Sequence, residues 1–335
     1  MNIILIDSGT TNSRIRLTRI NSNEIIDSIK LNIGVRNTAI EGNNTILKNG
    51  LKEGLLKIIN RNNLTSQEIE YIIASGMITS NLGIYEVPHI KGPASIKDFA
   101  SNSVVYKSEE FLNIPIIFIP GMENSVEDEN DIIFNINDYD IMRGEEVETI
   151  GLLEQINVKG KGIMILPGSH TKYIFVDEDK KLLSCLSTLG GETLLSIQKE
   201  TILSKSLKKD LICTIQKDML KKGYDAAREY GVTRGLYHVR LLDKFSELDS
   251  NYLANYYTGV IIHDDIKSLL KSLNNKEDID WVIIGGSDPL KNVFYYLIKH
   301  LELDWNIIKA NDEQVEYSTV IGSKTIASRY MKVKI

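Results

Sequence analysis

Near its start the chain carries an acidic residue at the end of an apolar run, followed by a turn rich in glycine and hydroxyl groups. Residues 7–14 read DSGTTNSR and follow the apolar run of residues 3–6. Such a turn offers backbone N–H groups and hydroxyls that can surround phosphate oxygens, and Gly9 allows a ligand to approach the backbone closely. Asp7 could hold Mg²⁺ through water, and Arg14 could pair with a phosphate. The alternative is an ordinary Asx or Ser/Thr turn of a β-hairpin.

Two further turns have a composition that suits phosphate or nucleotide. Residues 167–172 read PGSHTK after the apolar run 162–166, and they repeat the position of the first turn. Residues 285–288 read GGSD, follow an apolar run and precede a predicted helix. Glycines there allow a base or a phosphate to approach the N-terminus of the helix. A plain strand-to-helix connection would look the same.

Acidic and polar residues elsewhere could act on a substrate. Residues 140–146 read DIMRGEE and place carboxylates before and within the first turn of a predicted helix. A carboxylate there could accept the proton of a sugar hydroxyl, although acids at this position also simply complement the helix dipole. Residues 75–89, SGMITSNLGIYEVPH, follow a predicted strand and are too irregular for a regular element. We interpret them as a substrate loop, with a long solvated connection as the alternative.

The elements that must position these residues occur in two similar series. Apolar and alternating runs predict strands at 2–7, 14–20 and 24–32, followed by a helix at 45–60; the same order recurs as strands at 162–166, 172–176 and 181–188 and a helix at 192–205. The alternation in 14–20 predicts a half-buried strand. The repeat suggests two similar domains, and coincidence of common hairpins is the alternative.

Strands and helices alternate along the rest of the chain, which indicates an α/β class. Further strands are predicted at 72–74, 115–119, 281–284 and 307–309, and further helices at 145–155, 256–271, 288–301 and 320–331.

Length and composition narrow the classes of protein. The 335 residues suggest about two domains. A net charge of −6 and a pI of about 5.6 give no electrostatic reason to bind nucleic acid or an anionic membrane. No run approaches the ~18 apolar residues of a membrane span, and no basic segment precedes the first apolar run, so we expect a cytoplasmic protein. Cys185 and Cys213 lack metal-site spacing, and Cys185 reads as a buried small hydrophobe.

These motifs resemble the 2-dehydro-3-deoxygalactonokinase family, a branch of the actin/Hsp70/hexokinase-like ATPase superfamily of sugar kinases. The likeness runs in order from residue 3 to about residue 290, in segments IDSGTTNSR (6–14), GMITSNLGIYEVPHI (76–90), DIMRGEEVETIGLL (140–153), LPGSHTKYIFV (166–176), LYHVR (236–240) and 257–265. The chain departs from the family pattern in lacking a Trp near Ser8, in reading GSHTKY instead of GTHSKW, and in reading TLGGE at 188–192.

The resemblance implies a fold of two duplicated actin-like (ribonuclease H-like) domains, with mixed sheets flanked by helices and an interdomain cleft. The expected first domain covers residues 1–155 and is joined by the C-terminal helix 318–335. The expected second domain covers residues 156–317.

The resemblance also implies roles for individual residues. Asp7 would position Mg²⁺, and the β- and γ-phosphates of ATP would be held by Gly9, Thr10, Thr11 and Arg14. A second phosphate clamp would consist of Gly168, Ser169 and Thr171, and adenosine would be bordered by Gly285 and Gly286. The catalytic carboxylate would be Glu145, with Asp140 as its rival. Substrate contacts are expected from Arg16, Ser75, Gly76, Met77, Ser80 and His89.

The implied reaction transfers the γ-phosphate of ATP to O6 of 2-dehydro-3-deoxy-D-galactonate, with ATP and Mg²⁺ as cofactors. Three alternatives stay open: a kinase of the same superfamily acting on another sugar or sugar acid, a non-catalytic ATP- or sugar-binding regulator, and a polyphosphate or nucleoside-phosphate hydrolase. The implied partners are small molecules, and homo-oligomer formation is left open.

Overall fold

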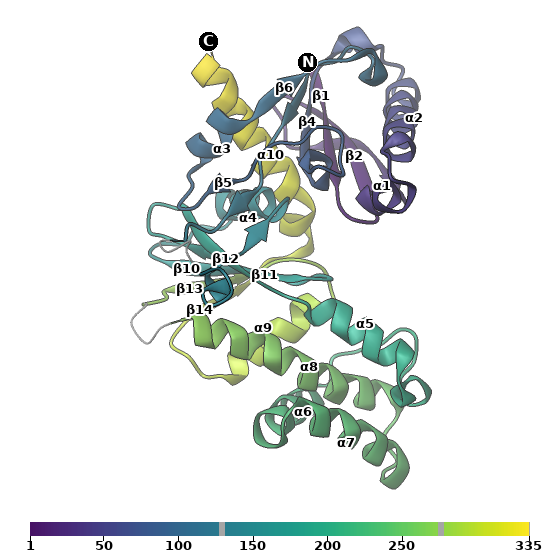
Figure 1. The fold of residues 1–335 in the computed structure, drawn as a ribbon, viewed down its shortest axis with the longest axis vertical. Helices are drawn as coiled ribbons and strands as arrows, with labels where there is room; N and C mark the ends of the chain where they lie inside the picture. Colours follow the sequence, from purple (N-terminus) through teal and green to yellow (C-terminus); the bar gives the residue numbers. More distant parts are fainter. Residues whose placement is uncertain (127–130, 274–277, 335) are drawn as a thin grey trace. The chain divides into compact units, whose positions relative to one another are not determined.

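The computed structural model describes residues 1–126, 131–273 and 278–334. It is an α/β protein, as predicted, and it divides into two compact units (Figure 1). Unit 1 comprises Met1–Asn157, Lys180–Cys185 and Glu313–Ile335, and unit 2 comprises Val158–Asp179 and Leu186–Asp312.

A six-stranded sheet with the order β3-β2-β1-β4-β7-β6 forms the centre of unit 1. Its strands are β1 (Asn2–Ser8), β2 (Ser13–Arg19), β3 (Ile25–Leu31), β4 (Ile69–Gly76), β6 (Val104–Tyr106) and β7 (Ile116–Phe118). Strand β1 pairs antiparallel with β2 and parallel with β4. The carboxyl ends of β1 and β4 therefore lie side by side, which brings together the segments that follow them.

Helices cover the sheet of unit 1. One face packs on α2 (Thr45–Arg61), whose apolar side chains Leu47, Leu51, Leu55 and Ile58 are all buried. The shorter helices α1 (Val35–Glu41) and α3 (Ile96–Asn102) belong to the same unit. Figure 1 shows α2, in purple, running beside β2. Because apolar residues recur on one face of α2 at helical spacing, the helix was predictable over nearly its full length.

The prediction of a half-buried strand at 14–20 is wrong, because both faces of β2 are covered. Arg16 and Thr18 lie on the face that should meet solvent, yet both are buried. Helix α10 (Asp312–Lys334) covers that face: Thr319 accepts a hydrogen bond from Arg16, and Lys324 donates to the carbonyl of Arg19. The closing helix is also longer than the predicted 320–331.

A small three-stranded sheet leads into the helix that carries the predicted acids. It has the order β5-β8-β9, from β5 (Ile90–Lys91), β8 (Met122–Glu123) and β9 (Ile141–Met142). Helix α4 (Glu145–Gln155) follows directly and packs against α10, since a methyl group added at Gly151 would lie 1.7 Å from the carbonyl oxygen of Ser318.

A five-stranded sheet with the order β12-β11-β10-β13-β14 is central to unit 2. Its strands are β10 (Gly162–Leu166), β11 (Thr171–Val176), β12 (Leu182–Thr188), β13 (Trp281–Ile284) and β14 (Asn306–Lys309). Strand β10 pairs antiparallel with β11 and parallel with β13, as β1 does with β2 and β4. The predicted repeat of strand–turn–strand–turn–strand is thus confirmed by the order of both sheets.

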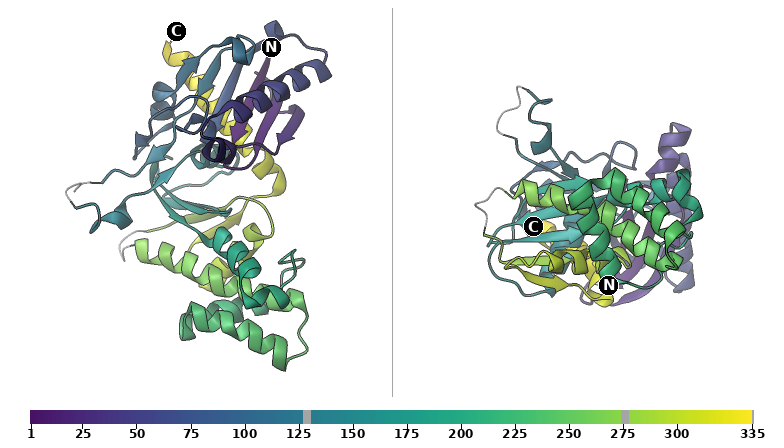
Figure 2. Two further views of the ribbon diagram at one scale, coloured as in Figure 1. Left: turned by 45° about the vertical axis from the view of Figure 1, so that its right-hand side comes forward. Right: turned by 90° about the horizontal axis from the view of Figure 1, so that it is seen from below.

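The helices of unit 2 form its apolar core together with the sheet. They are α5 (Gly190–Glu200), α6 (Lys217–Tyr230), α7 (Val232–Phe245), α8 (Ser250–Ser272) and α9 (Leu290–His300). Figure 2 shows α6, α7 and α8 as neighbours in both views. The first part of β12, up to Cys185, is counted with unit 1, and Cys185 is buried, as predicted.

None of the helices within the described ranges is long and apolar enough to cross a membrane.

Candidate active site

The first predicted phosphate turn lies at the carboxyl end of β1. The N–H of Gly9 donates to the carbonyl of Asn12 at 2.8 Å, which closes the turn. The carbonyl of Thr10 accepts from the N–H of Arg36 at 2.8 Å, so the start of α1 fixes the turn from one side. Gly9, Thr10 and Thr11 are exposed. The turn therefore has a defined backbone shape, and Thr10 and Thr11 present it to solvent, whereas the buried hydroxyls of Ser8 and Ser13 bond to each other.

Two arginines lie beside the Asp7 carboxylate. Asp7 pairs with Arg14 across the β1–β2 ladder. Burial raises the pKa of the Asp7 carboxyl, while the charges of Arg16 and Arg14 lower it. Bringing a cation to this carboxylate would favour its ionised form further.

Arg16 is engaged by helix α10. Its guanidinium donates to Glu316 at 3.1 Å and to Thr319 at 3.0 Å, and the residue is only 2% exposed. Its Nε has no hydrogen-bond partner among the described residues. Glu316 also lies 3.7 Å from Arg14. Arg16 thus contributes positive charge beneath Asp7 and fastens α10, but it is shielded from solvent.

The helix that carries the predicted acids begins against the end of β4. Gly144 precedes α4 with φ of 115°, and a methyl group added there would lie 3.2 Å from Cα of Gly76. Gly76 itself has φ of 80° and is paired with Ser8 on the neighbouring strand. Backbone at positive φ favours glycine, and so does so close an approach. Within unit 1 the structure therefore brings together Asp7, Gly76 and the Gly144–Glu145 segment.

The two adjacent acids of α4 have different environments. Glu145 is half-buried, and its Oε2 accepts the N–H of Arg143 at 3.0 Å. Glu146 is fully buried, and both of its carboxylate oxygens accept the N–H of Gly144, at 2.8 and 2.7 Å. Burial, with a smaller contribution from the charge of Glu145, raises the pKa of Glu146 to about 8. Of the two acids, only Glu145 can meet a ligand.

Asp140, the rival carboxylate, lies one short strand earlier. Its side chain accepts the N–H of Ile141 at 2.7 Å, and its carbonyl accepts the N–H of Asn124 at 2.9 Å. These bonds place Asp140 at the edge of the three-stranded sheet, whereas Glu145 directly follows the glycine that contacts Gly76.

The predicted substrate loop follows β4 and folds back on itself. Ser75, Gly76 and Ser80 are buried, and Met77 is half-buried. The Ser80 hydroxyl donates to the carbonyl of Met77 at 2.7 Å. His89 at the end of the loop meets the guanidinium of Arg143 at 3.2 Å. The loop therefore reaches the segment that carries Glu145.

The second predicted phosphate turn, in unit 2, lies on the start of α5. The N–H of Glu192 donates to the carbonyl of Ser169 at 3.0 Å, and a methyl group added at Gly191 would lie 2.0 Å from the carbonyl oxygen of Gly168. Thr171 donates to Asp265 of α8 at 3.1 Å. Burial raises the pKa of Asp265 to about 6. Backbone and side-chain contacts thus hold the turn from below.

The third glycine segment contacts the same turn. The N–H of Gly285 donates to the carbonyl of Ile165 at 2.9 Å. Gly286 has φ of 71°, and a methyl group there would lie 2.7 Å from the carbonyl oxygen of Pro167. Unit 2 therefore gathers Gly168, Ser169, Gly285 and Gly286 at the carboxyl ends of the neighbouring parallel strands β10 and β13, and their binding of a nucleotide stays a prediction.

Sequence reasoning missed several residues of these two clusters. They are Arg143, Glu146, Asp265 and Glu316. Arg143 and Glu146 stand inside the IMRGEE block, and Asp265 ends the segment 257–265, so the motifs contained three of the four. Their neighbours in space were not visible in the sequence.

No cluster of three or more His, Cys, Asp or Glu side chains that could hold a metal occurs in residues 1–126, 131–273 and 278–334. A single carboxylate such as Asp7 nevertheless suits Mg²⁺ that arrives with a nucleotide, because Mg²⁺ keeps several waters and takes other ligands from the phosphates.

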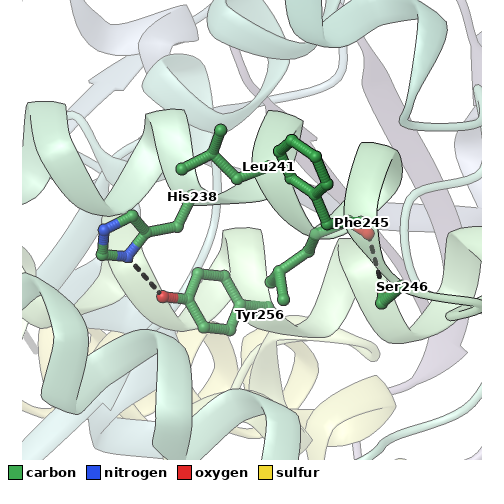
Figure 3. Close-up of a pocket in the computed structure, with 6 residues that line it drawn as sticks. His238, Leu241, Phe245, Ser246 and Tyr256 are labelled. Atoms are coloured by element: carbon green, nitrogen blue, oxygen red, sulfur yellow. Dashed lines mark hydrogen bonds between the residues drawn. The ribbon is translucent and has the colours of Figure 1, made fainter.

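An apolar hollow of about 310 Å³ lies on the helical part of unit 2 (Figure 3). It is lined by His238, Leu241, Leu242, Phe245, Ser246 and Tyr256. His238 and Tyr256 hydrogen-bond to each other at 3.0 Å. Its lining includes none of the predicted site residues and offers no carboxylate, so we do not assign the chemistry to it.

Comparison with known proteins identifies the relatives of this chain. The family model for 2-keto-3-deoxy-galactonokinase matches residues 7–321. A search of curated protein sequences found no match.

Solved structures share the fold. A protein from Sinorhizobium meliloti provisionally assigned as a 2-dehydro-3-deoxygalactonokinase has a TM-score of 0.72 at 20% identity, covering 97% of this chain and 99% of that one. The activator of 2-hydroxyisocaproyl-CoA dehydratase from Clostridium difficile, with bound ADPNP, has a TM-score of 0.51 at 13% identity, covering 100% and 97%. Component A of (R)-2-hydroxyglutaryl-CoA dehydratase from Acidaminococcus fermentans has a TM-score of 0.52 at 12% identity, covering 100% of both chains.

At these identities the structural likeness concerns the fold alone. The fold is that of the actin-like ATPases, and the prediction of this class is confirmed.

Proposed function

Because the chain belongs to the 2-keto-3-deoxy-galactonokinase family, whose model matches residues 7–321, we propose that it transfers the γ-phosphate of ATP to O6 of 2-dehydro-3-deoxy-D-galactonate. Members of this family are kinases that phosphorylate an alcohol group, and the chain is such a phosphotransferase. The observation that carries the proposal in the structure is the position of Glu145, which follows a glycine in contact with the end of β4, next to Asp7.

The nucleotide is proposed to be bound by the glycine and hydroxyl turns. In unit 1 the phosphate ligands are Gly9, Thr10, Thr11 and Arg14; in unit 2 they are Gly168, Ser169 and Thr171, with Gly285 and Gly286 beside adenosine. The exposed hydroxyls and defined backbone of the first turn support this role. The C. difficile activator of the same fold contains a bound ATP analogue, ADPNP.

Mg²⁺ is proposed to accompany ATP, with Asp7 as the protein residue that holds it, directly or through water. The ion would neutralise charge on the phosphates. Burial raises the pKa of the Asp7 carboxyl, and the charges of Arg16 and Arg14 oppose that rise; a bound cation would oppose it in the same way and so favour the ionised form that can hold the ion.

Glu145 is proposed as the general base. As O6 of the substrate attacks the γ-phosphorus, the O6–P bond forms and the bond from that phosphorus to the bridging oxygen of ADP breaks. The proton of the O6 hydroxyl passes to the Glu145 carboxylate. Such a base contributes ~10²–10⁴-fold, and positioning and charge stabilisation supply most of the rest.

The sugar acid is proposed to bind along the loop after β4, at Ser75, Gly76, Met77, Ser80 and His89. We no longer assign Arg16 to the substrate, because its guanidinium is buried and occupied by Glu316 and Thr319. Its proposed role is to keep positive charge beneath Asp7.

A substrate panel with coupled detection of ADP tests the proposal. 2-Dehydro-3-deoxy-D-galactonate should give the highest kcat/KM, ahead of its C4 epimer and of neutral sugars. A higher kcat/KM for another sugar acid would mean that the protein catalyses the same reaction on a different substrate. ATP turnover that needs no acceptor would favour hydrolysis, and nucleotide binding without turnover would favour a regulator.

A further inference from the structure

One guanidinium joins the catalytic segment to the substrate loop. Arg143 stands between β9 and α4, two residues before Glu145. Its Nη1 donates to the carbonyl of Thr79 at 2.7 Å and contacts the Thr79 hydroxyl at 2.6 Å. Its Nη2 donates to the carbonyl of Val87 at 3.0 Å and to Nδ1 of His89 at 3.2 Å. All of these groups belong to unit 1.

The acceptors of Arg143 lie at both ends of the loop. Thr79 is fully buried just after β4, and Val87 is buried where the loop returns. The loop also closes on itself, because the N–H of Val87 donates to the carbonyl of Thr79 at 3.0 Å. Arg143 caps this closure and attaches the closed loop to the start of α4.

The same residue is coupled to the proposed base through its backbone. The N–H of Arg143 donates to Oε2 of Glu145 at 3.0 Å, so one residue orients the base with its main chain and the loop with its side chain. Burial lowers the pKa of the Arg143 guanidinium, and the negative charges of Glu146, where it is ionised, and of Glu86 oppose that shift in part.

The contact with His89 defines the protonation of the imidazole. Arginine can only donate, so Nδ1 of His89 must accept and the neutral ring carries its proton on Nε2. The ring lies against Gly121, where a methyl group would come within 2.7 Å of Cδ2 of His89. The bond to Arg143 therefore fixes both the tautomer and the orientation of the proposed substrate residue His89.

We propose that Arg143 is a positioning residue of the reaction: its fork of N–H donors locks the loop 77–89 to the Glu145 segment, so that the sugar acid and its base keep one relative geometry. The inference rests on the proposed function for its kinetic consequence. Lysine cannot substitute, because a single ammonium cannot serve acceptors on Thr79, Val87 and His89 with the planar geometry of a guanidinium.

Arg143→Lys tests this role while keeping the charge. We expect kcat/KM for the sugar acid to fall about 100-fold, since a misplacement of about 1 Å can have such an effect, while KM for ATP stays unchanged. Arg61→Lys is the matched control: Arg61 is an exposed arginine of the same unit that pairs with Asp27 away from the site, and it should behave as the wild type. Free guanidinium added to Arg143→Ala should restore part of the lost activity.

Hydrogen exchange separates this inference from the proposed function, because it needs no substrate. In Arg143→Lys the amides of Ile84 and Val87, which donate to the carbonyls of Ile78 and Thr79, should exchange faster, while the amide of Ile72 in β4 should not change. Thr79→Val, which removes one acceptor and keeps the shape, should give a smaller effect in the same direction.

Unchanged exchange in the loop, or wild-type kcat/KM in Arg143→Lys, would overturn the inference. If Arg143→Lys weakened the use of ATP and of the sugar acid by the same factor, Arg143 would have only a structural role, and this result would also overturn the inference. If the wild type phosphorylates no sugar acid, the proposed function fails. If hydrogen exchange in the loop still responds to Arg143→Lys in that case, the inference that Arg143 attaches the loop to the Glu145 segment stands.

Discussion

Glu145 and Glu146 are adjacent in the sequence, but the fold gives them opposite environments. Glu146 turns back onto the N–H of Gly144 and is fully buried, while Glu145 remains accessible beside Gly76. The sequence identified the acid-rich start of α4 but could not show which of the two carboxylates is accessible and which is buried. That distinction depends on which side chain points into the unit, which the fold decides.

Replacing the proposed base should separate the two rival carboxylates. Glu145→Gln should lower kcat by ~10²–10⁴-fold with little change in ATP affinity, because the change removes proton transfer and keeps shape. Asp140→Asn serves as the comparison and should retain most activity. The measurements are steady-state kinetics and calorimetric titration with ATP. A larger loss from Asp140→Asn would transfer the role to Asp140.

Glu146 should make stability depend on pH. Its pKa rises from 4.5 to about 8 on folding, so its contribution is fully present below pH 4.5 and is lost as pH rises through 8. Between these values it should lower the free energy of unfolding by about 1.4 kcal/mol per pH unit. Glu146→Gln should remove this slope and raise the melting temperature at pH 8, as thermal denaturation at several pH values would show.

A matched control for Glu146→Gln is Glu154→Gln, since Glu154 is exposed on the same helix. Its pH profile should follow the wild type. A Glu146→Gln profile parallel to the wild type would mean that this carboxyl does not titrate with a raised pKa.

At the scale of elements, the strand–turn–strand groups were predicted and the helical region 217–245 was not, although α6 is strongly amphipathic; its packing is what the sequence leaves open. The strand–turn–strand groups are recognisable in the sequence because each begins with an apolar run that ends in glycine and hydroxyl residues. Helix α6 is rich in charge and contains Gly223, which contacts the backbone of α8 so closely that a methyl group would lie 1.9 Å from the carbonyl oxygen of Tyr256. That packing partner is 33 positions away, and no local pattern signals it.

The burial of charged residues also could not be predicted from the neighbouring sequence. Arg16 bonds to Glu316, which lies 300 residues later in the chain. Arg143 bonds to Thr79, which lies 64 residues earlier. The alternation in β2 predicted a solvated face because the covering helix α10 lies at the other end of the chain. The sequence could name the motif residues, but only the fold could show their partners.

The close contact between the second phosphate turn and the start of α5 can be tested by mutation. In Gly191→Ala the new methyl group would meet the carbonyl oxygen of Gly168 at 2.0 Å, so the turn must move away from the helix. We expect ATP to bind about tenfold more weakly, a loss of about 1.4 kcal/mol. The strain should also lower the free energy of unfolding by about 1–3 kcal/mol. Calorimetry and chemical denaturation measure the two effects.

Gly235→Ala in helix α7 is the control, because its methyl group would lie 3.1 Å from the Val260 side chain and no nearer than 3.7 Å to backbone, at Cα of Ala227. It should leave ATP binding unchanged. Wild-type affinity in Gly191→Ala would contradict the role of the second turn.

At the scale of the whole molecule, two sheets of matching strand order each end in a glycine and hydroxyl turn, and each turn is backed by a helix of its own unit. Duplication explains why one kind of motif appears twice in a single chain. The acid of the proposed reaction belongs to unit 1 alone, in the segment between the small sheet and α4. In the proposed function, the substrate is selected by the loop after β4 that Arg143 holds.

The most direct test of the account is to identify the product. The purified protein, given ATP, Mg²⁺ and 2-dehydro-3-deoxy-D-galactonate, should yield ADP and one sugar-acid monophosphate in equal amounts. Phosphorus-31 NMR should show the phosphorus coupled to the protons on C6. Inorganic phosphate as the only phosphorus product beside ADP, or a phosphate on another oxygen, would contradict the account.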